Sequence, residues 1–510
     1  MSTARKVRWK LTALLAAVTL LTTACASGGG GGDGEGGHVL RYGSSWKPTS
    51  LDPRQSASFD PIFLLTSYDA LIHREADGSL APGLATEWQL SEDALQLDLV
   101  LREGVTFQDG AVFDADAVAA NIEDSSQDGK TTASTLSIVD SVEVVDDTHV
   151  SLHLSSPGAG LINALSGEAG MMISPDALGN DDLGTTPVGA GPFSLVSNTQ
   201  AGLTYEKWDD YWDADSITLD GLEIKYLLDD PARTNALTSG QVDMAVLYGT
   251  QVAEVEAAGK EVATGNAAYM FAFWLNSGAE PFDDPDVRRA MVHALDRSAI
   301  NDAVFAGTCE PIVQPYSSGL WSHVDGLEES DAGKYDPELA KQLLADAGYA
   351  DGFDFTLLAG SSKIFGQAEE VMQAQLAEIG VNMSIDVREP TEVVTARRKG
   401  DFQASFAAIQ PGRPDESQFL TDYFVPGGRN NPGGFSEPAI DGPLAQLRLE
   451  DDQEARTEPM HQIVTTLLEA GAPLQPLCSQ EVIFAFDPKV KGVEVSVNYD
   501  YEFRNISLNN

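Results

Sequence analysis

Positive charge is scarce in this chain. Its 510 residues include 31 Lys and Arg against 78 Asp and Glu, which gives a formal net charge of −47. Binding to nucleic acid and docking on anionic lipid both need clustered cations, so this balance argues against both. Disorder is also a poor interpretation, because 43% of the residues are hydrophobic and can form a sizeable core. The length indicates two or three domains.

Long hydrophobic runs are absent apart from one near the N-terminus. Four basic residues lie within residues 1–10 and precede an apolar run of eleven residues, 11–21. That run is too short to span a bilayer stably, but it is typical of a signal peptide. It leads into residues 21–25 (LTTAC), which resemble a bacterial lipobox with Thr22 in place of the usual Leu. We expect residues 1–24 to be a lipoprotein signal peptide and Cys25 to be lipidated after cleavage.

The alternative to lipidation is a plain secretory signal with an incidental Cys. Residues 28–37 (GGGGGDGEGG) cannot pack and behave as a flexible coil. The Cys and this coil occur together, which favours lipidation and makes residues 25–37 a tether. Cleavage would remove four positive charges and leave a net charge of −51.

Cysteine is also rare, with three residues in the whole chain. Besides Cys25 these are Cys309 and Cys478. Outside the cytoplasm a disulfide is permitted, but the sequence leaves open whether the two are bridged or are two buried free thiols. Neither lies in a CxxC or His-rich context, which argues against a zinc site.

Short segments with alternating polarity dominate the first part of the chain. Residues 38–44, 95–101 and 150–154 have the pattern of strands, and residues 114–122 that of a short helix. We therefore expect a small α+β unit over about residues 76–186.

From about residue 282 the pattern changes to longer helices alternating with strands. Asp284 and Pro285 suit the cap and first position of a helix, and Gly380 suits the end of another. Strands are expected at 353–357, 381–387 and 402–409. This alternation predicts an α/β fold with a parallel sheet.

A series of short motifs runs through nearly the whole chain. They are SLDP at 50–53, DGSLAPGLATEW at 77–88, LREGVTFQDG at 101–110, PVGAGPF at 187–193, YW at 211–212, GQVD at 240–243, PF at 281–282, VRRA at 287–290, ALDR at 294–297, PGGFSEP at 432–438 and VKGV at 490–493. In number, order and spacing they resemble the extracytoplasmic solute-binding proteins of ABC transporters. The similarity is to the dipeptide/oligopeptide/nickel-binding family (family 5), in its lipoprotein form.

The resemblance implies an α/β, two-lobe periplasmic-binding-protein-like fold of type II with an extra small α+β domain. Lobe I would comprise residues 38–75, 187–281 and 478–510, the accessory domain residues 76–186, and lobe II residues 282–477. The ligand would lie in a cleft between the lobes, which close over it by a hinge motion. We expect a monomer.

The resemblance also places three aromatic residues near the cleft. Trp46 follows the first strand, Tyr248 follows the strand after the GQVD motif, and Trp274 lies in the strand that leads into the second lobe. Aromatic rings offer large, rigid surfaces on which a small ligand can stack. For each of them the alternative is ordinary core packing.

Residues 408–420 resemble the segment in which peptide-binding members carry an Asp that pairs with the peptide's free α-amine. Here that position falls on Gly412, with Arg413 beside it. An Arg in the cleft would suit a carboxylate or phosphate, because its fork of donors matches such groups. A shift of one to three residues in the alignment would instead return Asp415 to the amine-binding role.

Two further residues, Arg429 and Asn430 on a Gly-rich loop, are secondary candidates for ligand contact. Nickel is the other substrate known for the family. Of the seven His residues only His149 and His153 lie close in sequence, around an expected strand of the accessory domain, so no metal site and no cofactor are expected.

The function implied is that of a substrate-binding lipoprotein of an ABC importer. It would capture a peptide or peptide-like solute outside the membrane, at the outer face of the cytoplasmic membrane, and deliver it to the permease and ATPase subunits. The lipid would be its only link to the membrane, and no nucleic acid is expected as a partner. The alternatives are a non-peptide solute (an anionic compound, an oligosaccharide or a metal chelate) or a sensor role. No GxSxG, HExxH, P-loop or CxxC motif occurs in a usable context, so an enzyme is not expected.

Overall fold

The computed structural model describes residues 37–57, 60–361, 363–411, 415–497 and 501–509. The expected signal peptide, the lipidation site Cys25, nearly all of the tether, and Gly412 and Arg413 lie outside the described residues. No helix within the described ranges is long and apolar enough to cross a membrane. Residues 37–510 form one compact unit, and all the elements described below belong to it.

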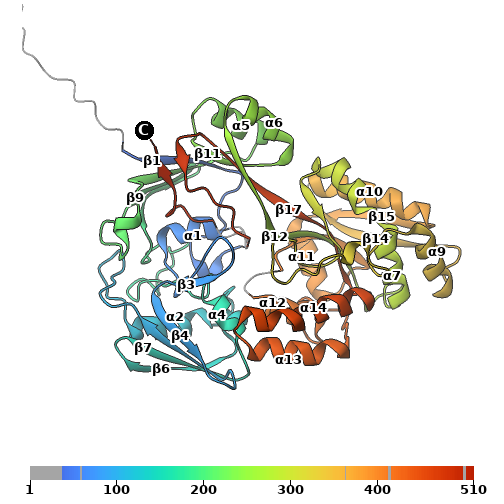
Figure 1. The fold of residues 1–510 in the computed structure, drawn as a ribbon, viewed down its shortest axis with the longest axis horizontal. Coiled ribbons are helices and arrows are strands. Elements are labelled where there is room, and N and C mark those ends of the chain that lie inside the picture. The colour runs from blue at the N-terminus through green and yellow to red at the C-terminus, as the bar shows by residue number, and fades with distance from the viewer. Residues whose placement is uncertain (1–36, 58–59, 362, 412–414, 498–500, 510) are drawn as a thin grey trace, which may run out of the picture. The chain divides into compact units, whose positions relative to one another are not determined.

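Two long strands, β12 (Glu261–Leu275) and β17 (Leu474–Phe486), connect the two lobes (Figure 1). They pair antiparallel with each other and lie at the centre of an 11-stranded sheet. On one side β17 pairs with a strand of lobe I, and on the other β12 pairs with a strand of lobe II. The β12–β17 register shifts between Asn266 and Met270, which marks the point where the sheet passes from one lobe to the other.

The described part of lobe I consists of strands and helices around an apolar core. Strand β1 is parallel to β10 and β11, while β8, β9 and β10 form an antiparallel meander. The strands are β1 (Val39–Ser44), β8 (Phe193–Thr199), β9 (Gly202–Lys207), β10 (Gly221–Tyr226) and β11 (Met244–Leu247), and the helices are α1 (Pro61–Ser67), α5 (Asp230–Thr238) and α6 (Val252–Ala257). The expected first strand at 38–44 is confirmed by β1.

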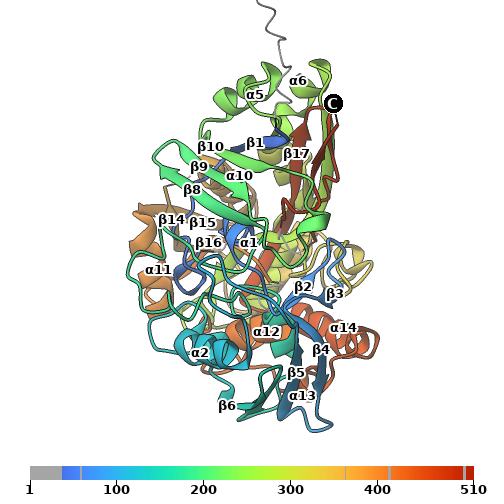
Figure 2. The same cartoon turned by 90° about the vertical axis from the view of Figure 1, so that its left-hand side faces the viewer.

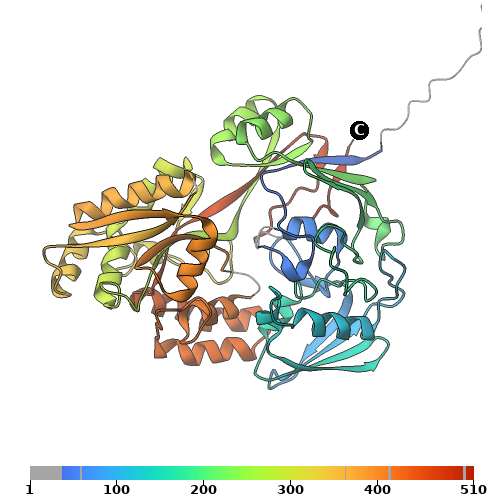
Figure 3. The ribbon, with the colours of Figure 1, turned by 180° about the vertical axis from the view of Figure 1, so that it is seen from behind.

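Lobe II has the parallel α/β pattern that the sequence predicted. Strand β14 is parallel to both β15 and β16, and helices cover the sheet (Figure 3). Its strands are β13 (Cys309–Pro311), β14 (Phe353–Gly360), β15 (Val381–Arg388) and β16 (Ala404–Ile409). Its helices are α7 (Pro285–Ala294), α8 (Arg297–Ile300), α9 (Pro337–Asp346), α10 (Lys363–Glu378), α11 (Pro390–Lys399), α12 (Glu416–Phe424), α13 (Asp441–Leu449) and α14 (Gln453–Glu469).

The helix α7 shows how the local sequence sets an element. Asp284 has extended backbone angles and its side chain accepts a hydrogen bond from the Asp286 amide at 2.8 Å, which caps the helix start. Pro285 takes the first helical position, where its missing N–H costs nothing. The apolar face of the helix, including Val287 and Met291, packs into the core beneath the sheet. The predicted cap and first position are confirmed.

The accessory domain is a four-stranded antiparallel sheet with the order β4–β5–β7–β6 (Figure 2). Alternate residues of β5, such as Leu97 and Leu99, are buried, as the alternation predicted. The elements of this part are β2 (Ile72–Arg74), β3 (Leu80–Pro82), β4 (Ala85–Leu90), β5 (Gln96–Leu101), β6 (Val139–Asp146), β7 (His149–Leu154), α2 (Ala115–Ser125), α3 (Ala133–Leu136) and α4 (Gly160–Ala164). Two short strands, β18 (Val490–Lys491) and β19 (Ser507–Leu508), pair near the C-terminus.

The lobe boundary on β12 differs from the expected one. Residues 187–281 were expected in lobe I, but β12 from Met270 to Leu275 pairs with β16 of lobe II. Phe271 and Phe273 pack in the core of lobe II. The alternation of a strand gives its buried faces but does not show that one strand serves two domains, so the sequence placed the boundary too late.

Cys309 and Cys478 are joined by a disulfide, with a Cα–Cα separation of 5.4 Å. Strand β13 is paired with β17 at this point, and both Cys residues are buried. The disulfide therefore links β13 of lobe II to β17, the strand that carries the chain back into lobe I.

A buried carboxylate holds the junction between lobe I and the accessory domain. Asp69 accepts hydrogen bonds from the Tyr211 hydroxyl at 3.1 Å and the Trp212 indole at 2.6 Å, and His73 Nε2 lies 2.5 Å from its other oxygen. Burial alone would raise the pKa of Asp69, but the charges of His73 and Arg504 and these hydrogen bonds bring it down to about 2. The YW motif of the sequence thus has a structural role.

We expect Asp69→Asn to lower the free energy of unfolding by about 3–5 kcal/mol, because it removes the charge that His73 and Arg504 face in a buried site. Since the pKa of Asp69 is depressed in the folded state, its contribution is present above about pH 4 and is lost as the pH falls toward 2. Denaturant unfolding monitored by circular dichroism at pH 7 measures the loss. The control is Asp128→Asn, because Asp128 lies on the exposed surface, and a substitution there should leave the free energy of unfolding close to that of the wild type. Equal stability of the two variants would contradict this role.

Candidate functional site

A cavity of about 640 Å³ lies where lobe I, the accessory domain and lobe II face one another. Lobe I contributes Ser56 and Ala57, and the hinge strand β12 contributes Tyr269. The rest of the lining comes from residues 131–135 and 164–169 of the accessory domain and from α11, β16, α12 and the loop after α12 in lobe II. We call it the cleft cavity. Its volume is in the range of small-ligand sites.

The floor of the cleft cavity on the lobe II side is the end of β16. Residues 404–409 (ASFAAI) form a buried apolar strand at the centre of lobe II, and Ala408, Ile409 and Gln410 reach the cavity at its carboxyl end. Ligands in open α/β sheets characteristically bind outside the carboxyl ends of the strands. The position of the cavity therefore follows from the sheet topology.

Two guanidinium groups line the cleft cavity. Arg398 comes from the last turn of α11, and Arg429 comes from the loop after α12. Arg429 Nη1 lies 3.5 Å from the Ser134 hydroxyl of the accessory domain, so its side chain extends across the cavity from lobe II. Both Arg residues are exposed in this structure, which leaves their donors accessible to an anionic group.

Two carboxylates share the same lining. Glu168 comes from the accessory domain and Asp422 from α12. Burial raises the pKa of Asp422, while a 2.9 Å hydrogen bond from Gln418 Nε2 and the charge of Arg429 act against that rise. The cavity therefore presents groups of both signs, which suits a ligand that carries both an amine and a carboxylate.

Aromatic side chains stand beside these charges. Tyr423 lies on α12, where burial raises its pKa to about 12, so its hydroxyl stays neutral and can act as a hydrogen-bond donor. Tyr269 lies on β12 next to the hinge register shift, and burial raises its pKa as well. Both rings offer flat apolar surface to a bound molecule.

Trp46 and Tyr248 line a second cavity of about 190 Å³, next to the hinge. Tyr269 belongs to both cavities, so the two are neighbours along β12. Trp46 packs edge-on against Phe63 with ring centroids 6.2 Å apart, and the guanidinium of the buried Arg233 lies 5.8 Å from the Tyr248 ring. The structure thus brings these two predicted residues together, beside the cleft cavity.

Trp274 does not line either of these cavities. It is 6% exposed and packs in lobe II against Phe402 and Tyr423, with ring centroids 5.8 and 5.3 Å apart. Direct ligand contact by Trp274 stays a prediction, and in this structure its ring supports Tyr423, which does line the cleft cavity. The reason is that β12 has already entered lobe II at this residue, so the side chain faces the core of that lobe.

Asp415 is placed differently from its expected role at a ligand amine. It caps α12 and is 2% exposed, and its carboxylate accepts from Arg456 Nη2 at 2.9 Å, from Asn163 Nδ2 at 3.1 Å and from the Ser417 amide at 2.8 Å. Burial alone would raise the pKa of Asp415, but the Arg456 charge and the Ser417 hydrogen bonds hold it below its usual value. Asp415 does not line the cleft cavity. Of the other predicted contacts, Arg429 and Asn430 do line it, and Arg413 lies outside the described residues.

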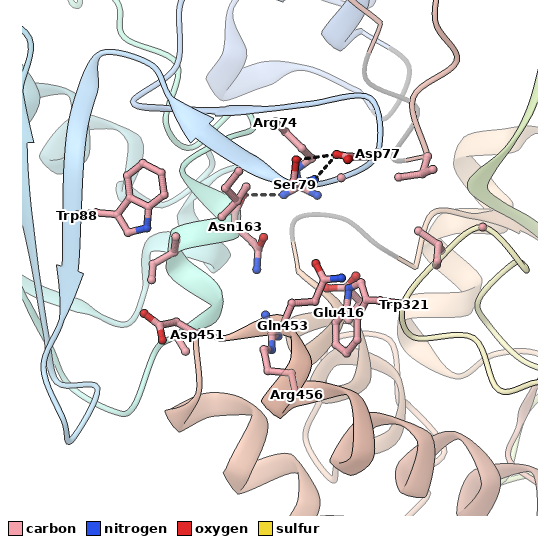
Figure 4. Close-up of a pocket in the computed structure, with 17 residues that line it drawn as sticks. Arg74, Asp77, Ser79, Trp88, Asn163, Trp321, Glu416, Asp451, Gln453 and Arg456 are labelled. Carbon is pink, nitrogen blue, oxygen red and sulfur yellow. Dashed lines mark hydrogen bonds between the residues drawn. The ribbon is translucent and has the colours of Figure 1, made fainter.

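Glu416, next along α12, points into another cavity, of about 370 Å³ (Figure 4). Arg456 and Trp321 of lobe II face it from below, and Arg74 faces it from the other side. Burial, together with the negative charge of Asp415, raises the pKa of Glu416 to about 7, and the charges of Arg456 and Arg74 only partly offset this. Two neighbouring buried carboxylates thus differ, and Asp415 is the one that holds the negative charge.

Arg398, Glu168, Asp422 and Tyr269 were missed by the sequence reasoning. Arg398 lies on a helix that the periodicity predicted, but nothing in the pattern shows which end of that helix faces the other lobe. Glu168 and Asp422 are two among 78 acids and carry no local motif. Position next to the carboxyl end of a central strand is the one signal that could have pointed to this region.

The fold and the cavity between its lobes define a binding protein of the two-lobed kind. Residues 79–431 match the family described as bacterial extracellular solute-binding proteins, family 5, and the chain belongs to this family. Members are extracytoplasmic solute-binding proteins rather than enzymes, and they work with an ABC permease and ATPase.

Individual relatives agree over nearly the full length. The glutathione-binding protein GsiB of Pectobacterium atrosepticum is 28% identical over 490 residues, which is 92% of this chain and 94% of the relative. GsiB of Escherichia coli K12 is 26% identical over the same shares. Among solved structures, AgaA of A. tumefaciens R10 in complex with agropinic acid is 26% identical with a TM-score of 0.78, and covers 92% of this chain and 99% of its own. DppA of Helicobacter pylori in complex with peptide STSA has the same fold, with 22% identity and a TM-score of 0.79 over 92% and 98% of the two chains.

We expect Glu416→Gln to change how stability depends on pH. Because the pKa of Glu416 is raised by folding, the wild type loses stability as the pH rises from about 4.5 toward 7. The variant cannot ionise at this position and should become the more stable protein above pH 7, while the two proteins should agree below pH 4.5. Thermal unfolding followed from pH 4 to pH 8.5 measures the difference. Parallel curves for the two proteins across this range would contradict the prediction.

Proposed function

We propose that this protein is the substrate-binding lipoprotein of an ABC importer for short peptides or peptide-like zwitterions, and that the ligand binds in the cleft cavity. The observation that carries the proposal is that guanidiniums and carboxylates line the same cavity. Arg398 and Arg429 would take the carboxylate of the ligand, and Asp422 and Glu168 would take its amine. Such pairing fixes both ends of a small zwitterion.

The relatives support a peptide ligand. GsiB proteins are named as glutathione-binding and are related to this chain over 92% of its length. Glutathione carries one amine and two carboxylates, which matches a cavity that offers both guanidiniums and acidic side chains. Tyr269 and Tyr423 would pack against the apolar parts of the ligand.

A second candidate ligand is a small anionic compound that is not a peptide. Arg398 and Arg429 together favour it, and so does the structural similarity to AgaA, whose complex contains agropinic acid. The two candidates differ in their need for the acidic residues, because a ligand without an amine gains nothing from Asp422.

We expect the purified protein to bind glutathione or short peptides saturably, and Arg429→Ala to weaken that binding by about 10-fold or more, because a charged hydrogen bond to a carboxylate is lost. Isothermal titration calorimetry measures both affinities. The matched control is Arg388→Ala, because Arg388 pairs with Asp386 at the end of β15 and is not part of the cleft lining.

Two outcomes would count against this assignment in different ways. Absence of saturable binding of glutathione, dipeptides and tripeptides by the wild type would remove the peptide proposal. Binding by the wild type with equal affinity for Arg429→Ala would keep the peptide and remove Arg429 as its carboxylate partner. Loss of affinity on Asp422→Asn would favour the zwitterion over the purely anionic compound.

We further propose that Cys25 anchors the chain to the outer face of the cytoplasmic membrane through lipid, with residues 25–37 as the tether. The support is the lipobox-like sequence before Cys25 and the Gly-rich segment after it. Cys25→Ala should move the protein from the membrane fraction to the soluble fraction and abolish metabolic labelling with palmitate. Ser27→Ala is the control and should leave both unchanged. Continued membrane association of Cys25→Ala would overturn the lipid anchor.

A further inference from the structure

The accessory domain and lobe II meet where α4 approaches the start of α12 and the end of α13. Figure 3 shows these elements side by side from behind, and Figure 1 shows the same proximity from the front. The Ala159 amide donates a hydrogen bond to the Arg448 carbonyl at 3.0 Å, and Asn163 Nδ2 donates to Asp415 Oδ2 at 3.1 Å. Backbone and side chain both connect the two domains here.

This contact requires glycine at position 160. A Cβ atom on Gly160 would lie 2.6 Å from Asp415 Oδ1, 2.8 Å from the Asp415 carboxyl carbon and 3.1 Å from the Ser417 hydroxyl oxygen. The first two separations are closer than any ordinary carbon contact. Gly160 does not have a positive φ, so the requirement comes from space between the domains and not from backbone conformation.

The carboxylate of Asp415 has most of its partners within lobe II. Arg456 and Ser417 both belong to that lobe, so they stay with Asp415 whatever the position of the accessory domain. When the domains separate, Asp415 gives up only its hydrogen bond from Asn163, and water can replace it. Asp415 therefore stays paired with Arg456 when the domains separate. The contact can break without the large cost of an unpaired buried charge.

We propose that α4 and the start of α12 form a closure latch that stabilises the closed state of the cleft, with Asp415, Asn163 and Gly160 as positioning residues. Neither Gly160 nor Asn163 lines the cleft cavity, but Gly160 and Asp415 line a neighbouring cavity of about 300 Å³ that shares Ser134, Thr135, Ala164 and Gln418 with it. The latch is proposed to act on a ligand of the cleft cavity by holding the domains together. The inference rests on the proposed function in one respect, namely that closure of this cleft retains the ligand.

The latch has a quantitative consequence. The apparent affinity of a ligand falls in proportion to the fraction of protein in the binding-competent state. A change at the latch should therefore weaken every ligand of the cleft by the same factor, whereas a change in the cleft lining should weaken ligands according to their chemistry.

The first test is Gly160→Ala in the purified full chain. We expect a larger radius of gyration than the wild type by small-angle X-ray scattering without ligand, and affinity for glutathione lower by about 10-fold. The matched control is Gly179→Ala, because the Cβ position of Gly179 has open space around it and its φ is not positive. The control should match the wild type in both measurements.

The second test, Asn163→Asp, keeps the size of the side chain and places a second negative charge against Asp415. It should also open the protein. The unfolding temperatures of Gly160→Ala and Asn163→Asp, each compared with that of the wild type, show whether a change in radius comes from misfolding of α4. Radii equal to the wild type for both variants would overturn the latch. The scattering comparison needs no ligand, so failure of glutathione to bind the wild type would count against the peptide proposal, while the radii would still decide for or against the latch.

Discussion

The pairing of β12 with β17 is the constraint on which the rest of the structure depends. These two strands are the centre of the sheet, and each lobe adds its own strands to one side of the pair. The cleft cavity lies next to them, with Tyr269 of β12 in its lining. The sheet is continuous through this pair, and the register of the pair changes between Asn266 and Met270, at the passage from one lobe to the other. A bulge of this kind bends a strand and increases its local twist.

Several of the few arginines lie in the interior of the protein. In a chain with only 31 Lys and Arg, at least Arg54, Arg233, Arg288, Arg297 and Arg456 are 7% exposed or less. Arg288 and Arg297 donate to backbone carbonyls, and Arg456 pairs with Asp415. Several of the few cations thus stabilise the interior. The interior of the described part also buries seven acids (Asp52, Asp60, Asp69, Asp243, Glu369, Asp415 and Glu416), so the exposed surface keeps nearly all of the negative charge. Against that surface, the exposed Arg398 and Arg429 in the cleft cavity are local exceptions that favour a ligand with a carboxylate.

Much of the fold could be predicted from the sequence, because alternation and helical periodicity are local properties. The strands at 38–44 and 95–101, the cap of α7 by Asp284 and the parallel order around β14 all follow from neighbouring residues. The division of β12 between two lobes could not be predicted, since it depends on which distant strand pairs with each half.

The candidate site was harder to predict for the same physical reason. Asp415 was the alternative for the amine-binding position if the alignment shifts by one to three residues, and in the structure its carboxylate accepts from Arg456 and Asn163, which lie 41 and 252 residues away. No local pattern encodes such partners. The resemblance to a family pointed to residues 408–420, and several residues of this segment line the cleft cavity, whose role as the ligand site is a proposal. The individual contacts depend on how side chains from three domains meet.

The position of β17 in the sheet also determines when the fold can be completed. This strand comes from the last tenth of the chain, yet it stands between β12 and β11. Until residues 474–486 are present, the strands of lobe I and those of lobe II are two separate sheets with open edges, and Cys309 has no partner. A chain that is synthesised from its N-terminus therefore completes the centre of its large sheet last. Until β17 is available, the two partial sheets must remain soluble with open edges.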